Sequence, residues 1–132
     1  MVAVAMNSRR GAAAFTLIEL LVVMAIVALL VSLASPRYFG SLSRAKETAL
    51  QQTLSVVRDS IDKYYADNGK YPDDLAMLVN KRYLRGLPVD PITGSDGTWL
   101  IVAPDDPEKG GVYDIQSGAD GMGRNGKPFR EW

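Results

Sequence analysis

Few side chains in this sequence could carry out catalysis. The chain has 132 residues, with no histidine and no cysteine, and its 15 basic residues balance 15 acidic ones. These absences exclude thiol nucleophiles, Ser-His-Asp chemistry, the usual zinc ligand sets and disulfide bonds. The balanced charge argues against a nucleic-acid-binding protein, which normally carries a basic surplus. Carboxylates, lysines and tyrosines remain, but their spacing indicates no reaction, so we predict a protein that is not an enzyme.

One carboxylate stands in an unusual place, because Glu19 is the only charged residue in the apolar run of residues 15–35. A helix of this length, at ~1.5 Å per residue, would cross the ~30 Å hydrocarbon core of a bilayer. Arg9 and Arg10 precede the run and no long basic cluster follows it, which predicts a cytoplasmic N-terminus. A carboxylate in the middle of a bilayer would cost about 2.5–3.5 kcal/mol, so Glu19 needs an explanation.

Three interpretations of the apolar run are open. It could be an export signal cleaved after Ala34, because small residues stand at Ser32 and Ala34. It could be a single-pass anchor that tolerates Glu19. In the third interpretation the chain is cut between Ala14 and Phe15, so that Phe15 gains an α-amino group four residues before Glu19. The carboxylate of one subunit could then pair with the amine of its neighbour and set the register of parallel helices.

A second pattern follows the apolar run and predicts an amphipathic helix that continues to Asn68. Pro36 lies between the two patterns and lacks a backbone donor, so we expect a helix kink or local melting there. Gly69 after Asn68 is a stop signal. The predicted apolar stripe consists of Phe39, Leu42, Ala45, Ala49, Leu50, Leu54, Val57, Ile61, Tyr64 and Tyr65.

The chain beyond this helix is rich in turns. Asp73 or Asp74 can cap a short helix at residues 76–80. Residues 98–102 and 112–115 are predicted to be two short strands joined by a long hairpin loop. The sequence therefore predicts a small α+β domain.

The residues after Gln116 are rich in glycine and have no hydrophobic rhythm. We therefore expect a loop that is held by something other than a core. Packing of Phe129 and Trp132 against the domain is one such fastening.

The residues around Glu19 resemble the type IV pilin and pseudopilin superfamily. Residues 15–21, Phe-Thr-Leu-Ile-Glu-Leu-Leu, follow a short basic leader, as in the class III signal recognised by prepilin peptidase. The resemblance implies cleavage between Ala14 and Phe15, N-methylation of Phe15, and a role for Glu19 in filament assembly. The family usually has glycine before the cut, whereas this chain has Ala14. Alanine is also small, so we expect processing.

The resemblance continues along the chain and is strongest to the major pseudopilin of type II secretion. Residues 64–72 are similar to the end of its long helix, residues 83–91 to the segment that follows, and residues 117–121 to its C-terminal loop. Pro36 matches a proline common in the family's helix. Type IVa pilins usually close their C-terminal region with a disulfide, so the lack of cysteine favours a pseudopilin.

This resemblance implies an α+β, pilin-like fold with a long N-terminal helix packed on a small antiparallel sheet. Its parts would be a leader at residues 1–14, a transmembrane and filament-core helix at residues 15–35, and a periplasmic globular domain at residues 36–132. Such a subunit waits in the bacterial inner membrane and then self-associates into a periplasmic pseudopilus that drives protein secretion. The implied partners are prepilin peptidase, minor pseudopilins, an inner-membrane assembly platform and a cytoplasmic secretion ATPase. A minor or competence pilin and a secreted soluble binding module are the alternatives.

The C-terminal loop of this family often binds calcium through a backbone carbonyl and carboxylates. The resemblance implies that Asp120 is a side-chain ligand and that Ser117 is a carbonyl donor. Residues 122–127 depart from the family pattern, because they are shorter and basic and lack the expected acidic ligands. A purely structural role for Asp120, in a glycine-rich turn, is the alternative.

Overall fold

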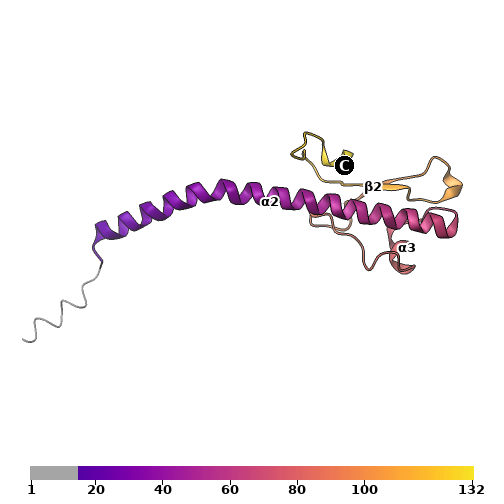
Figure 1. Cartoon of the computed structure of the whole chain (residues 1–132), viewed down its shortest axis with the longest axis horizontal. Helices are drawn as coiled ribbons and strands as arrows, with labels where there is room; N and C mark the ends of the chain where they lie inside the picture. The colour runs from indigo at the N-terminus through magenta and orange to yellow at the C-terminus, as the bar shows by residue number, and fades with distance from the viewer. Residues whose placement is uncertain (1–14) are drawn as a thin grey trace, which may run out of the picture. The chain divides into compact units, whose positions relative to one another are not determined.

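The computed structural model describes residues 15–132, and the chain divides into two compact units. The first unit ends at Gly40 and the second is Ser41–Trp132. Helix α2 (Leu17–Asn68) contributes to both units (Figure 1). The predicted boundary between residues 35 and 36 stays a prediction, and the predicted leader lies outside the described residues.

Helix α2 has 52 residues and ends where the sequence predicts. Gly69 follows it with φ of 73°, a left-handed conformation that glycine adopts without strain, and its amide donates to the carbonyl of Tyr65 at 2.8 Å. The helix continues through Pro36, so the local melting expected there does not occur. The kink expected at Pro36 stays a prediction.

The second unit contains the small antiparallel sheet that the sequence predicts. Strands β1 (Leu100–Val102) and β2 (Asp114–Gln116) pair so that Ile101 lies opposite Ile115. Both strands start two residues later than predicted, and a short 3-10 turn, Pro107–Lys109, lies in the loop between them. The hairpin loop also pairs with the chain after α2, because Tyr71 donates to the carbonyl of Lys109 at 2.6 Å.

A short helix, α3 (Leu75–Asn80), confirms the second predicted helix. Asp74 caps it by accepting a hydrogen bond from the backbone amide of Met77 at 2.8 Å. One face of α3 contributes Leu75 and Leu78 to the core.

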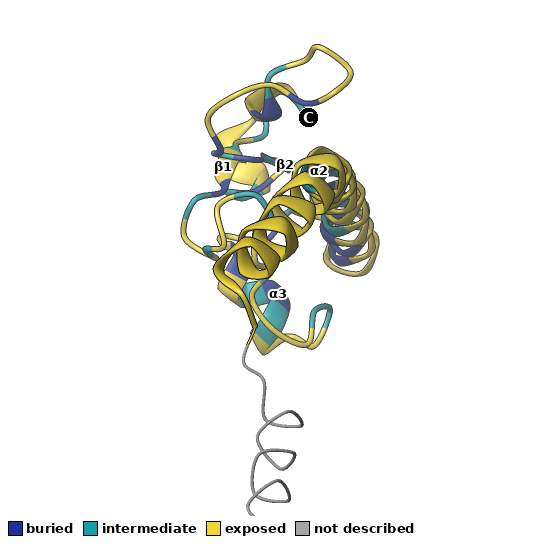
Figure 2. Ribbon diagram, turned by 90° about the vertical axis from the view of Figure 1, so that its left-hand side faces the viewer, coloured by how far each residue is buried: buried dark blue, intermediate teal, exposed yellow. Residues whose placement is uncertain are grey.

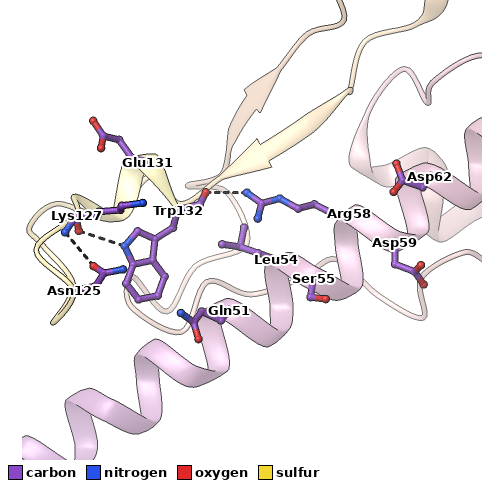
Figure 3. Close-up of a pocket in the computed structure, with 10 residues that line it drawn as sticks. All are labelled: Gln51, Leu54, Ser55, Arg58, Asp59, Asp62, Asn125, Lys127, Glu131 and Trp132. Atoms are coloured by element: carbon purple, nitrogen blue, oxygen red, sulfur yellow. Dashed lines mark hydrogen bonds between the residues drawn. The ribbon is translucent and has the colours of Figure 1, made fainter.

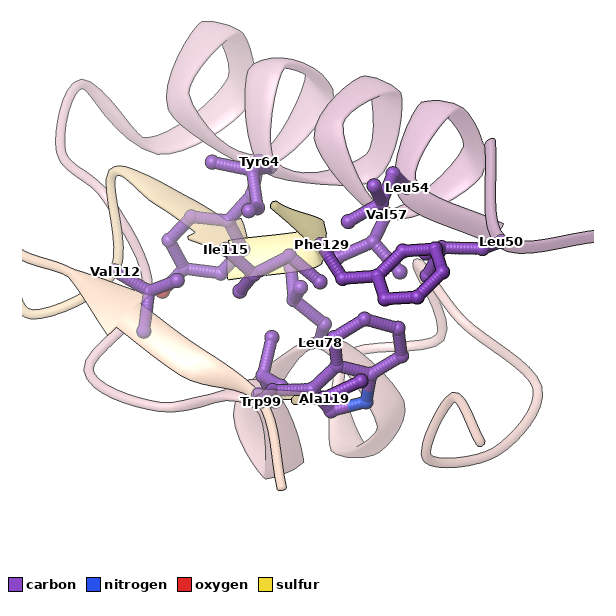
Figure 4. Packing of buried hydrophobic residues seen from close by; sticks show 12 residues of the cluster. Leu50, Leu54, Val57, Tyr64, Leu78, Trp99, Val112, Ile115, Ala119 and Phe129 are labelled. Atoms are coloured by element: carbon purple, nitrogen blue, oxygen red, sulfur yellow. The ribbon is translucent and has the colours of Figure 1, made fainter. Parts of the chain in front are cut away.

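One hydrophobic core holds the second unit together, with one face of α2 packed against the elements that follow it (Figure 4). Ile115 of β2 lies fully buried in it, which places the sheet against the helix. The core consists of Leu50, Leu54, Val57, Ile61, Tyr64, Leu75, Leu78, Trp99, Val112, Ile115, Ala119 and Phe129.

The predicted apolar stripe of α2 begins too early. Phe39 is 61% exposed and Leu42 is 41% exposed, and the buried face starts only at Leu50. A side chain is buried only where another element covers it, and the core residues from later in the chain gather on the part of α2 from Leu50 onward. Burial along α2 accordingly changes partway along the helix (Figure 2).

Candidate functional site

The N-terminal motif forms a capping box at the start of α2. The carboxylate of Glu19 accepts a hydrogen bond from the backbone amide of Thr16 at 3.0 Å. The hydroxyl of Thr16 in turn accepts one from the backbone amide of Glu19 at 3.2 Å. This reciprocal pair satisfies two donors that a helix start leaves without partners, and a carboxylate is also favoured near a helix N-terminus. Because Thr16 is the cap, α2 begins at Leu17 and not at the predicted Phe15.

This role of Thr16 was not predicted from the sequence. A sequence signal was available, because residues 16–19, Thr-Leu-Ile-Glu, have the Thr-x-x-Glu spacing of a capping box directly before an apolar run. Glu19 therefore has a local function in the subunit as well as the predicted one between subunits. The role of Glu19 in assembly stays a prediction, as does the modification of Phe15, and Ala14 lies outside the described residues.

The apolar part of α2 exposes its side chains to its surroundings. It contains an 18-residue window of mean hydropathy 2.9, and none of that window is buried within the chain. Phe15 is 86% exposed, Leu17 is 75% exposed and Leu29 is 61% exposed. Soluble proteins rarely leave such a continuous apolar surface uncovered. Its length and composition fit a single-pass membrane anchor.

The C-terminal segment, residues 117–132, is attached to the second unit through a buried hydrogen-bond network. Ser117 is fully buried, and its hydroxyl donates to the carboxylate of Asp90. The other oxygen of Asp90 accepts from the backbone amide of Ile92 at 2.8 Å, so the buried carboxylate also organises its own turn. The hydroxyl of Ser117 accepts from the amide of Ala119 at 3.2 Å. The side chain of Ser117 thus joins two loops that are distant in sequence.

The importance of Asp90 was also missed from the sequence. The chain beyond α2 was predicted to be rich in turns, but the burial of Asp90 in one of them was not predicted. Aspartate commonly starts such turns by accepting hydrogen bonds from backbone amides. This local preference does not indicate whether a second loop will bury the aspartate.

The groups around Asp120 do not form a ligand set that fits a calcium ion. Its carboxylate accepts a hydrogen bond from the guanidinium of Arg130 at 2.9 Å, and its side chain is 96% exposed. Within residues 15–132 there is no group of three or more acidic side chains that could hold a metal. Calcium requires six to eight oxygen ligands, and a neighbouring cation opposes its binding. The calcium site at Asp120 and Ser117 stays a prediction, and the hydrogen bond from Arg130 favours the structural alternative for Asp120.

The C-terminal segment is part of the core, contrary to the expectation that something else holds it. Ala119 is 3% exposed and Phe129 is 7% exposed, and both belong to the hydrophobic cluster. Trp132 packs beside Phe129 with their rings 5.2 Å apart. The fastening by Phe129 and Trp132 is therefore confirmed. The sequence did not predict that this segment joins the core, because Ala119 and Phe129 stand isolated in a glycine-rich stretch and form no periodic apolar pattern.

Tyrosines gather where α2 ends. The ring of Tyr65 stacks on that of Tyr71 at 4.4 Å, and Tyr71 meets Tyr113 edge-on at 5.3 Å. The hydroxyl of Tyr83 donates to the carboxylate of Asp67 at 2.6 Å, and this hydrogen bond raises the pKa of Tyr83 above its ordinary value of 10.0. These contacts pack the tyrosines against one another within the second unit, although Tyr113 stays 52% exposed.

Comparison with known proteins places these features in one class. Residues 9–35 match the prokaryotic N-terminal methylation motif. With a capped apolar helix that begins within this motif and a small α+β unit after it, the chain is a type IV pilin-like protein. No solved structure matches the chain significantly.

Relatives along nearly the whole chain identify the family. A Pseudomonas aeruginosa protein described as "Type II secretion system core protein G" is 33% identical over 130 aligned positions, which cover 86% of this chain and 87% of that protein. Proteins with the same description from Klebsiella pneumoniae and Klebsiella michiganensis are 31% and 28% identical, and each alignment covers 96% of this chain. The two alignments cover 96% of the Klebsiella pneumoniae protein and 94% of the Klebsiella michiganensis protein. The chain belongs to the family of type II secretion system core protein G, the pseudopilins.

Proposed function

We propose that this chain is a structural subunit of a type II secretion pseudopilus, with no catalytic activity of its own. One combination of observations carries the proposal. The chain has the methylation motif and an uncovered apolar helix, and it aligns over most of its length with proteins described as type II secretion system core protein G. The alternatives of a minor or competence pilin and of a soluble secreted module have no comparable support.

The uncovered half of α2 has two uses in this proposal. Before assembly it anchors the subunit in the inner membrane, with the N-terminus in the cytoplasm and the second unit in the periplasm. On assembly it leaves the lipid and packs among copies of itself in the core of the filament. Both surroundings are apolar, so the hydrophobic free energy of the transfer nearly cancels. Helix packing and polar contacts must then determine the register.

Glu19 is the polar contact available for that purpose. In the single subunit its carboxylate already holds the amide of Thr16. A carboxylate has about four lone-pair sites, so it can keep this bond and also accept the α-ammonium group of a neighbouring Phe15. The pair forms only after prepilin peptidase has cut the chain between Ala14 and Phe15. Processing thereby controls when subunits can assemble, and an assembly platform with its ATPase supplies the work of extraction.

The N-terminus of the mature protein tests this proposal. We expect N-terminal sequencing of the membrane-purified protein to begin at Phe15, and the intact mass to show the loss of residues 1–14 and one added methyl group. The same preparation should yield filaments when the chain is produced with its secretion apparatus, and none when prepilin peptidase is deleted. A mature protein that begins after Ala34 would instead support a soluble exported module and overturn the proposal.

A further inference from the structure

Arg58 lies where three segments of the second unit meet. Its guanidinium donates through Nε to the carboxylate of Asp114 at 2.8 Å. Through Nη2 it donates to the carbonyl oxygen of Ile115 at 3.1 Å. The same nitrogen donates to the main-chain oxygen of Trp132 at 2.8 Å (Figure 3). One side chain of α2 thus holds both β2 and the end of the C-terminal segment.

The three acceptors are one side-chain carboxylate and two main-chain oxygens, which are atoms of the kinds that also bind calcium. Here a guanidinium binds them. A guanidinium is permanently charged and directs its five donors in a fixed plane, so it can bridge several oxygens at once, as an ion does. Its bonds join residues that are 56, 57 and 74 positions apart, which is the long-range connection that a bound metal often provides.

The fold of the C-terminal segment also depends on Trp132. Its indole donates to the carbonyl of Lys127 at 3.3 Å (Figure 3). Gly123 is needed opposite the ring, because a side chain there would overlap the indole. The turn closes behind it, with the amide of Gly123 donating to the carbonyl of Lys127 at 2.9 Å. The C-terminal segment therefore wraps around the indole ring of Trp132, and Arg58 binds the main-chain oxygen of the same residue.

The charge of the C-terminal segment agrees with this arrangement. It carries three basic residues, Arg124, Lys127 and Arg130, against Asp120 and Glu131. Arg130 pairs with Asp120, the one carboxylate that the family resemblance assigns to calcium. The segment thus carries no surplus of negative side chains that would attract a divalent cation.

We infer that Arg58 is a built-in cation that fastens the C-terminal segment, so that the fold of this subunit does not require calcium. The inference goes beyond the filament function, because it concerns what holds each subunit together. It is independent of processing and assembly, so it can fail without affecting the proposed function.

Thermal unfolding of the full chain in detergent tests the first half of the inference. The chain has two tryptophans, Trp99 and Trp132, and both lie in the second unit, so intrinsic fluorescence reports on its unfolding. We expect the same midpoint temperature in millimolar calcium chloride and in excess EGTA, and no heat of calcium binding by titration calorimetry. A midpoint that rises with calcium, or a saturable binding signal, would overturn the inference.

Two matched substitutions on α2 test the role of Arg58. Arg58→Gln removes the charge and most of the donors, and we expect the midpoint to fall by about 5–10 °C. Lys63→Gln is the control, because Lys63 pairs with Asp59 at 3.0 Å on the same helix but is 68% exposed, and such pairs contribute little. A fall no larger than that of the control would contradict the role of Arg58.

A conservative change covers the case in which Arg58→Gln does not fold. Arg58→Lys keeps the charge but has a single nitrogen, which cannot reach all three oxygens with the geometry of a planar fork. We expect a midpoint between those of the wild type and Arg58→Gln, or a folded variant where the glutamine variant is not. A lysine variant as stable as the wild type would show that the multiple bonds of the guanidinium are unnecessary.

Discussion

Both parts of helix α2 carry leucines, but these leucines have opposite surroundings. In the first unit, Leu29 is 61% exposed and Leu33 is 66% exposed. In the second unit, Leu50 is fully buried and Leu54 is 2% exposed. The later part of α2 is covered by α3, the sheet and the C-terminal segment, so its leucines stabilise the subunit itself. The earlier part is uncovered and can gain stability only from lipid or from other copies of the chain. One helix therefore serves both folding and assembly, at different residues.

The largest expected effect is on assembly, at the polar residue of the uncovered part. Glu19→Ala should leave membrane insertion intact and abolish filaments, because it removes the negative charge that would pair with the neighbouring ammonium group. Shearing of cells followed by sedimentation and immunoblotting measures this.

Glu19→Gln separates the two roles of Glu19. Glutamine can still accept the amide of Thr16 and keep the capping box, but it has no charge. We expect it to fail in assembly as the alanine variant does. Normal filaments from the glutamine variant would reduce Glu19 to a helix cap.

The covered part should respond to substitutions in its stability. Leu54→Ala leaves a cavity in the core and should lower the free energy of unfolding of the second unit by about 2–5 kcal/mol. Leu29→Ala is the matched control on the same helix, and its effect on that free energy should stay within about 0.5 kcal/mol. Chemical denaturation followed by tryptophan fluorescence gives both values. Equal losses for the two leucines would contradict the division of α2 into two functions.

A smaller loss of stability is expected from the buried carboxylate that holds the C-terminal segment. Asp90→Ala leaves the hydroxyl of Ser117 and the amide of Ile92 without their acceptor, which should cost about 1–3 kcal/mol. Asp96→Ala, an exposed aspartate in the next turn, serves as the control and should have little effect. The same denaturation experiment compares them. An Asp90 variant as stable as the control would show that this network contributes nothing.

The smallest effect is a pH dependence at the end of α2. Hydrogen bonding to Asp67 raises the pKa of Tyr83 in the folded state above the ordinary value of 10.0. The hydroxyl is therefore protonated more readily in the folded than in the unfolded chain, and its contribution is fully present below pH 10. It is lost as the pH rises through the folded pKa. We expect the stability difference between wild type and Tyr83→Phe to shrink over that alkaline range, and a constant difference would contradict the assignment.

Local signals in the sequence account for most of the predicted elements. The end of α2 at Asn68, the cap of α3 and the hairpin of β1 and β2 each follow from residues close together in the chain. The Thr16–Glu19 capping box was equally local and could have been predicted. These features depend on hydrogen bonds over a few residues, which sequence spacing shows directly.

Long-range placement could not be predicted in the same way. Whether Leu42 or Leu50 is buried depends on how far the later elements reach along α2. That Arg58 meets Asp114 and the main-chain oxygen of Trp132 depends on segments dozens of residues apart. The sequence by itself determined the long apolar helix, its charged residue and the kinds of element that follow. Only the tertiary structure decided which side chains are covered and which cation holds the C-terminal segment, because burial and ion pairing are properties of distant residues brought together.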